Sequence, residues 1–275
     1  MDDQRRRACI LNYGASAWAF EDLARQLADG LGVDVATSPR AYNYVLGAER
    51  DDLPGPNALF VDVDTIELAG DKRRLAVAFR AGGVPTPETH LIPDLDAARE
   101  FVRVHDDHEW CLKYPIGSGA SGHRLFASDT EVPKEWPAPY VVQEFIRLER
   151  PEVYRVYAAG GQLFGWLVRR YNDGRGSPWV AHACGAYWET LSQIPPEVMA
   201  PAQAAFVATN LFDTFGCADL LRRPNGDWVV LEVGTDGIFT QVDRDLGDPT
   251  FEQELLARIR DSFWLRFSRL QRGGA

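Results

Sequence analysis

A hairpin with one acid in each strand is the strongest structural signal in this sequence. Residues 216–233 read GCADLLRRPNGDWVVLEV, which is two apolar runs around a turn-forming segment at 223–227. Asp219 lies in the first run and Glu232 in the second. Because an unpaired buried carboxylate is costly, acids in such positions usually meet a cation or a hydrogen-bond donor. The pattern therefore predicts two adjacent antiparallel strands that carry partnered carboxylates.

Two carboxylates on adjacent strands can converge on one Mg²⁺ ion. Mg²⁺ in proteins takes one or two carboxylates and completes its coordination with phosphate oxygens and water. Asp219 and Glu232 are therefore candidate metal ligands, and the pair points to chemistry on nucleotide phosphates. The alternative is a hairpin with a purely structural role, whose acids face the solvent or a nearby arginine.

The composition is that of an ordinary globular protein. The chain has 275 residues, of which 45% are hydrophobic and 25% charged, so it can form one large domain or a few small ones. The formal net charge is −11 and no basic cluster is evident, which disfavours nucleic acid as a partner. No apolar run approaches the roughly 18 residues of a membrane helix, and the N-terminus lacks the apolar core of a signal peptide. We therefore expect a cytoplasmic protein without a membrane partner.

The first part of the chain alternates between strand and helix patterns. Residues 8–12 are expected to form a strand, and residues 18–31 carry apolar side chains at helical spacing. Further short strands are expected at 33–35 and 58–61. This alternation predicts a small parallel α/β unit.

The remainder of the chain changes pattern twice. Residues 71–81 predict a helix with Asp71 as its N-cap, and strands follow around a glycine-rich loop at 115–122, PIGSGASG. From residue 152 onward, short strands and tight turns predict antiparallel structure, with helices at 195–211 and 251–270. The fold class predicted from these patterns is mixed α/β (α+β).

A series of short motifs resembles a known superfamily. In chain order they are DKRRL, GVPTPET, LKYPIGSGASGHRL, YVVQEFI, YRVY, GQLFGWLVRR, GCADLL and WVVLEV. Taken in this order they resemble the ATP-grasp superfamily, and within it the carboxylate–amine ligases of the RimK and D-alanine–D-alanine ligase types. The resemblance covers most of the chain and implies three domains: a small N-terminal parallel α/β domain at 1–70, a central lid domain at 71–143, and a C-terminal antiparallel β-sheet domain at 144–275.

The resemblance implies ATP and Mg²⁺ as cofactors and assigns residues to the phosphates. Lys113 matches the family lysine near the α-phosphate, and Lys72 matches a second lysine that reaches the phosphates. The glycine-rich loop would close over them, since glycines let backbone N–H groups approach the phosphate oxygens. The loop residues implied in binding are Gly117, Ser118, Gly119 and Ser121.

The segment after the loop resembles the interdomain hinge that reads the base and the sugar. The backbone of Phe145 and Ile146, together with the side chain or backbone of Glu144, would contact the adenine edge. Either Glu149 or Glu152 would bind the ribose hydroxyls, and the sequence leaves that choice open.

The resemblance also assigns two arginines to catalysis. Arg155 and Arg169 match arginines near the acyl substrate and the transferred phosphoryl group, for which a guanidinium fork is suited. Arg170 would replace Arg169 if the strand register shifted by one residue. Asp219 and Glu232 match the family's Mg²⁺ ligands, whereas Gly234 occupies the place of a third ligand that is normally Asn. One or two Mg²⁺ ions remain possible on this basis.

The implied reaction is the ATP-dependent ligation of a carboxylate to an amine through an acyl phosphate. Amino acids or short peptides are the expected substrates, and Asp236, Asp243 and Arg244 would bind them. Two alternatives stay open: an ATP-grasp phosphotransferase, and an ATP-binding module without turnover. A homodimer is compatible with the resemblance, because dimers are common among related ligases.

Overall fold

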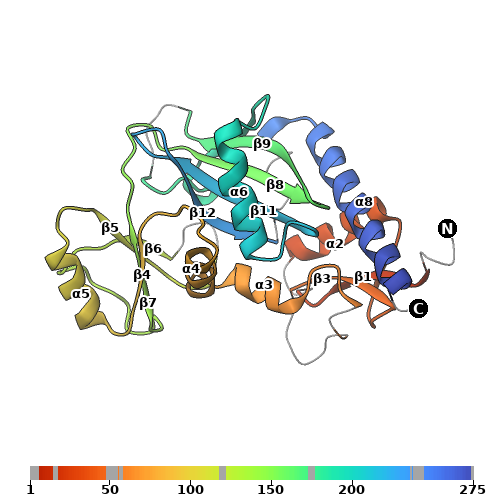
Figure 1. Cartoon of the computed structure of the whole chain (residues 1–275), viewed down its shortest axis with the longest axis horizontal. Coiled ribbons are helices and arrows are strands. Elements are labelled where there is room, and N and C mark those ends of the chain that lie inside the picture. The colour runs from red at the N-terminus through yellow and green to blue at the C-terminus, as the bar shows by residue number, and fades with distance from the viewer. Residues whose placement is uncertain are drawn as a thin grey trace.

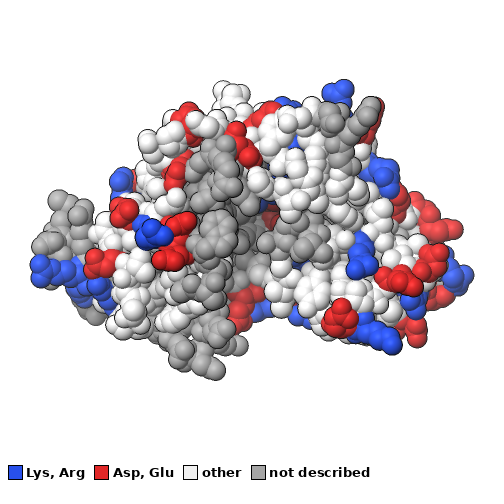
Figure 2. All heavy atoms as spheres, turned by 180° about the vertical axis from the view of Figure 1, so that it is seen from behind, with Lys and Arg blue, Asp and Glu red and all other residues white. Residues whose placement is uncertain are grey.

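Among the residues that the structure describes, the strands form three separate β-sheets that follow one another along the chain (Figure 1). The computed structural model describes residues 6–14, 18–47, 55, 58–117, 122–172, 177–235, 237 and 245–273. The first and second sheets lie at opposite ends of the molecule, and the third lies between them (Figure 1). No helix in these ranges is long and apolar enough to cross a membrane. On the face in Figure 2, acidic and basic side chains are mixed over the described residues.

The N-terminal sheet is parallel, as the sequence predicts. It has the order β2-β1-β3, with β1 at Ala8–Asn12, β2 at Asp34–Ala36 and β3 at Tyr42–Leu46, and helix α2 at Trp18–Leu31 packs on it. The strand expected at 58–61 is wrong. This segment lies along the free edge of β3, where it makes only an isolated parallel bridge between Leu59 and Asn43, with one backbone hydrogen bond from the Phe60 N–H to the Asn43 carbonyl at 2.9 Å.

The second sheet is antiparallel and has the order β4-β7-β5-β6. Its strands are β4 at Thr89–Ile92, β5 at Trp110–Lys113, β6 at His123–Leu125 and β7 at Tyr140–Glu144, with helix α5 at Leu95–Val104 packed against them. Helices α3 at Val63–Gly70 and α4 at Lys72–Ala81 precede the sheet. Asp71 is the N-cap of α4, as predicted: its side chain accepts a 2.8 Å hydrogen bond from the Arg73 N–H.

The third sheet is antiparallel throughout and carries the acid-bearing hairpin. Its order is β10-β9-β8-β11-β12, with β8 at Val153–Ala159, β9 at Gln162–Arg170, β10 at Tyr187–Thr190, β11 at Phe215–Arg222 and β12 at Trp228–Gly234. Helix α6 at Pro196–Ala208 covers one face, and the short helix η3 lies at His182–Cys184. Asp219 stands directly opposite Glu232 in the β11–β12 ladder, which confirms the predicted strand pairing.

The last helix, α8 at Thr250–Gly273, joins the first sheet to the third. Phe267 stacks on Tyr42 of β3 at 4.9 Å between ring centroids, and the Trp264 indole N–H donates to the Leu31 carbonyl at 3.0 Å. On the other side, the Ser262 hydroxyl donates to the Thr214 carbonyl at 3.0 Å. The N-terminal sheet and the C-terminal sheet therefore share one hydrophobic core.

Candidate nucleotide and metal site

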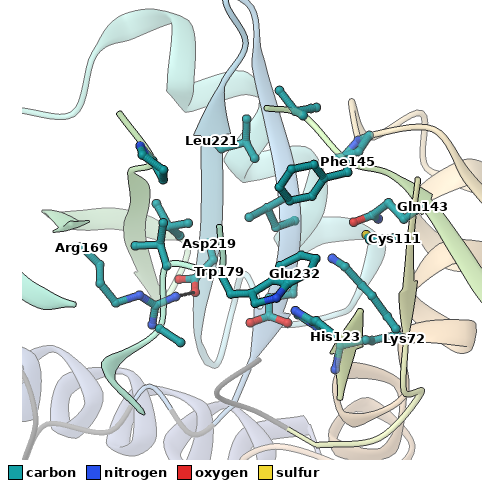
Figure 3. A pocket seen from close by; sticks show the side chains of 18 of the residues that line it. Lys72, Cys111, His123, Gln143, Phe145, Arg169, Trp179, Asp219, Leu221 and Glu232 are labelled. Atoms are coloured by element: carbon teal, nitrogen blue, oxygen red, sulfur yellow. Dashed lines mark hydrogen bonds and ion pairs between the residues drawn. The ribbon is translucent and has the colours of Figure 1, made fainter. Parts of the chain in front are cut away.

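A cavity of about 530 Å³ lies between the second and third sheets (Figure 3). Its walls come from both sheets: Cys111 and Gln143 contribute from one, and Leu221 and Glu232 from the other. A volume of this size is typical of cofactor and small-molecule sites. One part of the lining is apolar and the other is ionic, which suits a ligand with a flat base and a charged tail. The apolar part includes Phe145, Ile146, Val180, Leu221 and Leu231, and the ionic part includes Lys72, Lys113, Arg155, Arg169, Asp219 and Glu232.

A buried ion cluster occupies the ionic part of the cavity. Arg155 on β8 stands opposite Asp219 on β11 and binds it with both arms of its guanidinium group, Nε to Oδ1 at 2.6 Å and Nη2 to Oδ2 at 3.0 Å. Arg169 on β9 adds one longer contact, Nη2 to Oδ2 at 3.3 Å. Burial alone would raise the pKa of Asp219, but the two guanidinium groups outweigh it and lower that pKa. Asp219 is therefore an ionised carboxylate, although only 3% of its surface is exposed.

Arg169 is less completely bound than Arg155. Its Nε atom is buried and has no hydrogen-bond partner in the described part of the chain. Burial lowers the pKa of Arg169, and Asp219 opposes that effect. A buried donor without an acceptor is costly, so this N–H is suited to donate a hydrogen bond to an oxygen of a bound anion. The neighbouring Arg170 instead pairs with Glu152 and Glu189 and is not part of the cavity lining, so the register places Arg169 at the site.

The two hairpin acids are the carboxylates of the cavity that could hold a Mg²⁺ ion together with phosphate oxygens. Asp219 and Glu232 occupy paired positions on adjacent strands, and both line the cavity. Over the described residues there is no group of three or more His, Cys, Asp or Glu side chains that could hold a metal ion. Gly234 also lines the cavity but offers no side-chain oxygen. This donor set matches the preference of Mg²⁺ for few carboxylates and several phosphate oxygens.

The two candidate lysines lie beside the entry to the glycine-rich loop. The Lys72 ammonium donates to the Gly117 carbonyl at 2.8 Å, and the Lys72 N–H donates to the Pro115 carbonyl at 2.9 Å. Lys113 ends β5 and pairs with His123 of β6. The structure thus brings both lysines and Gly117 to the cavity. Ser118, Gly119 and Ser121 lie outside the described residues.

His123 is unsuited to act as a base here. Its burial and the charges of Lys113 and Lys72 lower its pKa to about 2, so the imidazole is neutral near pH 7. Its ring makes an edge contact with Trp179, with ring centroids 5.3 Å apart. Trp179 in turn contacts Phe145 at 5.2 Å, so the indole lies between the hinge and the glycine-loop strand (Figure 3).

At the hinge, the backbone and side chain of Glu144 already have protein partners. The Glu144 carboxylate accepts two hydrogen bonds from Arg223, at 2.5 and 2.6 Å, and its N–H donates to the Glu88 carbonyl at 2.8 Å. The Phe145 N–H donates to the Glu109 carbonyl at 2.7 Å. Glu144, Phe145 and Ile146 all line the cavity, so the structure brings the three hinge residues to one wall of it.

The structure separates the two ribose candidates. Glu152 lines the cavity and accepts hydrogen bonds from the Tyr154 hydroxyl at 2.5 Å and from Arg170 at 3.2 Å. Glu149 is exposed and does not line the cavity. The geometry therefore favours Glu152. The substrate candidates Asp236, Asp243 and Arg244 lie outside the described residues.

The Glu144–Arg223 pair leads to a prediction about stability and pH. Hydrogen bonds from Arg223 lower the pKa of Glu144 below its unfolded value of about 4.3. Replacing Glu144 with Gln should therefore cost about 2 kcal/mol of folding free energy at pH 7. A depressed carboxyl pKa stabilises the fold above the unfolded pKa and loses that effect as the pH falls through the folded pKa. Urea unfolding should show the difference between wild type and variant shrinking below about pH 4.3.

A matched control is available in the exposed Glu100–Arg103 pair. Glu100→Gln should leave the unfolding midpoint nearly unchanged both at pH 7 and below about pH 4.3, because solvent screens an exposed pair. An equal loss in the two variants would contradict a specific role for the Glu144–Arg223 pair.

Three residues at the site had no recognisable signal in the sequence. Arg223 lies in a turn, where an arginine is ordinary, and its partner is 79 positions away. Trp179 and Trp188 lie in a segment without periodic pattern, and only the folded chain brings them to the hinge and to the arginines.

Comparison with known proteins supports the fold. No protein-family model matches the chain. The chain is 27% identical over 177 residues to beta-citrylglutamate synthase B of Danio rerio, a match that covers 60% of this chain and 41% of that protein. The chain thus spans about two-fifths of the length of this curated relative.

Solved structures match over nearly the whole chain at low identity. D-alanine–D-alanine ligase from Bacillus anthracis has a TM-score of 0.66 at 12% identity, over 98% of this chain and 100% of that chain. The RimK domain ATP-grasp protein from Sphaerobacter thermophilus has a TM-score of 0.65 at 16% identity, over 94% and 99%. The ATP-grasp ligase PsnB, in complex with a precursor variant, Mg and ADP, has a TM-score of 0.66 at 13% identity, over 95% and 99%. The chain therefore has the fold of the ATP-grasp ligases, as the order of its motifs predicts.

Proposed function

We propose that this protein is an ATP-dependent carboxylate–amine ligase that forms an amide bond through an acyl phosphate. The observation that carries the proposal is the buried Arg155–Asp219–Arg169 cluster beside Glu232, which shares one cavity with Lys72 and Lys113. Basic side chains that converge on a pair of carboxylates suit a magnesium-bound triphosphate. The relatives with this fold include ligases, and PsnB was solved with Mg and ADP.

Each side chain has a defined task in the proposed reaction. Lys72 and Lys113 hold the phosphate tail, and Asp219 and Glu232 hold Mg²⁺, which when bound neutralises charge on the phosphates. A carboxylate oxygen of the substrate attacks the γ-phosphorus, and the bond from that phosphorus to ADP breaks. Arg169 lies where its unpartnered Nε–H can bind the transferred group. Charge stabilisation and positioning account for most of the rate in such transfers.

The second step completes the amide bond. An amine attacks the acyl carbon, inorganic phosphate leaves, and the nitrogen loses a proton. The acyl phosphate is open to hydrolysis, so the cavity between the two sheets has to exclude water during this step. We further propose amino acids or short peptides as substrates and the cytoplasm as the place of reaction. PsnB, solved with a precursor peptide, supports a peptide-like partner.

A product assay tests this function against its alternatives. We expect release of both ADP and phosphate from Mg·ATP only when a pool of carboxylates and a pool of amines are both present. A phosphotransferase would instead produce ADP and a stable phosphorylated product without free phosphate. Binding of Mg·ATP without turnover in any pool would contradict the ligase proposal.

Replacing Lys113 with Met should weaken nucleotide binding by about 10- to 100-fold. The ammonium group would donate a charge-assisted hydrogen bond to a phosphate, which is worth roughly 1.5–3 kcal/mol. Calorimetric titration with Mg·ADP measures the change. Lys134→Met is the control, because Lys134 is exposed and does not line the cavity. Equal affinities in wild type and Lys113→Met would remove this lysine from the phosphate site.

A further inference from the structure

Trp188 forms the aromatic wall of the arginine pair. It lies on β10 directly opposite Arg169 on β9, and only 2% of its surface is exposed. The guanidinium carbon of Arg155 is 4.7 Å from its ring centroid, and that of Arg169 is 4.8 Å away. Both guanidinium groups also bind Asp219, so each is in contact with the carboxylate and with the indole.

This arrangement addresses a problem of charge and orientation. Two guanidinium groups lie close together, and the single charge of Asp219 compensates only one of them. The electron-rich ring face attracts both cations, and this attraction is strongest where water is excluded. Arg155 is already oriented by two short contacts, whereas Arg169 has one contact at 3.3 Å. The orientation of Arg169 therefore depends more on the indole.

The indole itself is firmly placed. The indole is only 2% exposed, and the Trp188 backbone is held on both sides: its backbone N–H donates to the Asp245 carboxylate at 3.0 Å, and its strand is paired with β9 along Tyr187–Thr190. A ring with a fixed position can limit the rotamers of the more loosely bound Arg169 side chain. This is the arrangement expected of residues that support a reactive group.

We propose that Trp188 is a positioning residue that holds the Arg169 guanidinium toward the transferred phosphoryl group. The proposal rests on the ligase function stated above. Trp188 does not touch the substrates and acts only through Arg169.

The first test needs neither ATP nor turnover. We compare the urea unfolding of wild type, Trp188→Leu, Arg169→Met and the double variant, because methionine at position 169 removes the cation, whereas lysine would keep one. If indole and guanidinium interact as the structure indicates, the double variant should be less destabilised than the sum of the single variants, by about tenfold in the unfolding equilibrium constant. Additive effects would overturn the proposal, whether or not the protein is a ligase.

The second test separates positioning from general packing. Trp188→Leu should lower kcat about tenfold and leave the affinity for Mg·ADP unchanged, and Trp188→Phe should recover most of the loss because it restores a ring face. In an Arg169→Lys background, Trp188→Leu should have little further effect on kcat.

Trp166 offers a matched control on the same sheet. It is also buried, at 5% exposure, but it packs against Tyr154 and Trp228. Trp166→Leu should reduce stability like Trp188→Leu without the drop in kcat. An equal drop in both variants, or a tenfold drop that persists in the Arg169→Lys background, would show that Trp188 acts through packing alone. If wild type binds Mg·ADP but turns over no substrate, the proposed ligase function is wrong. The unfolding comparison still shows whether the Trp188 indole and the Arg169 guanidinium interact.

Discussion

Replacing Arg155 with Met is expected to destabilise the protein by about 3–5 kcal/mol, the typical cost of removing one partner from a buried ion pair. Asp219 is almost completely buried, and Arg155 supplies its two shortest contacts. Without them the carboxylate keeps only the 3.3 Å contact with Arg169. Urea unfolding in the absence of nucleotide measures the loss.

The double variant provides the control for this prediction. Adding Asp219→Asn to Arg155→Met removes the carboxylate that has lost its two shortest hydrogen bonds, so the double variant should be less destabilised than the sum of the two single variants. Arg169→Met alone should cost less than Arg155→Met, since Arg169 contributes a single longer contact. A double variant as unstable as the sum of its two changes would contradict the view that charge compensation dominates at this cluster.

Replacing Glu232 with Gln should lower turnover by at least about 100-fold while the unfolding midpoint stays the same. Mutation of a group that merely orients a metal ligand typically lowers activity or metal affinity about 10- to 100-fold. The loss of a direct ligand should therefore lower turnover by more than that. Glu232 is only half-buried, and the change to an amide keeps its shape, so the fold should tolerate it. Steady-state release of ADP and phosphate measures the effect.

Asp227→Asn is a matched control in the same hairpin. Asp227 is an exposed acid one residue before β12 and does not line the cavity. Its replacement should leave turnover unchanged. Near-normal turnover in Glu232→Gln would remove Glu232 from the metal site and with it the reason for placing Mg²⁺ on this hairpin.

The features that could be predicted from the sequence are those encoded within short segments. Two apolar runs around a turn predict the hairpin with one acid in each strand. That Asp219 stands directly opposite Glu232 depends on a register shift between Asp219 and Leu220, which the runs do not predict. The cap at Asp71 and the helix that follows it depend on neighbouring residues in the same way. The order of such segments sufficed to indicate the fold class.

The features that could not be predicted depend on contacts between distant segments. The strand expected at 58–61 has enough apolar residues, but in the folded chain it makes only one isolated bridge to the free edge of β3, which pairs with β1 on its other side. The partner of the Glu144 carboxylate comes from a turn in another sheet. No local pattern distinguishes Trp188 from an ordinary core tryptophan, because its importance comes from two arginines on other strands.

The helix α8 has a consequence for how the protein is made. Its aromatic side chains complete the packing around Tyr42, although they are synthesised more than 200 positions later, as the 233-residue separation of the Trp264–Leu31 contact illustrates. A nascent chain emerging from the ribosome folds its early segments first when their partners are at hand. Here the partners emerge more than 200 residues later, so the apolar side of the first sheet stays open to water until α8 has been synthesised. Chaperones that shield exposed apolar surface should therefore meet this chain chiefly at its beginning.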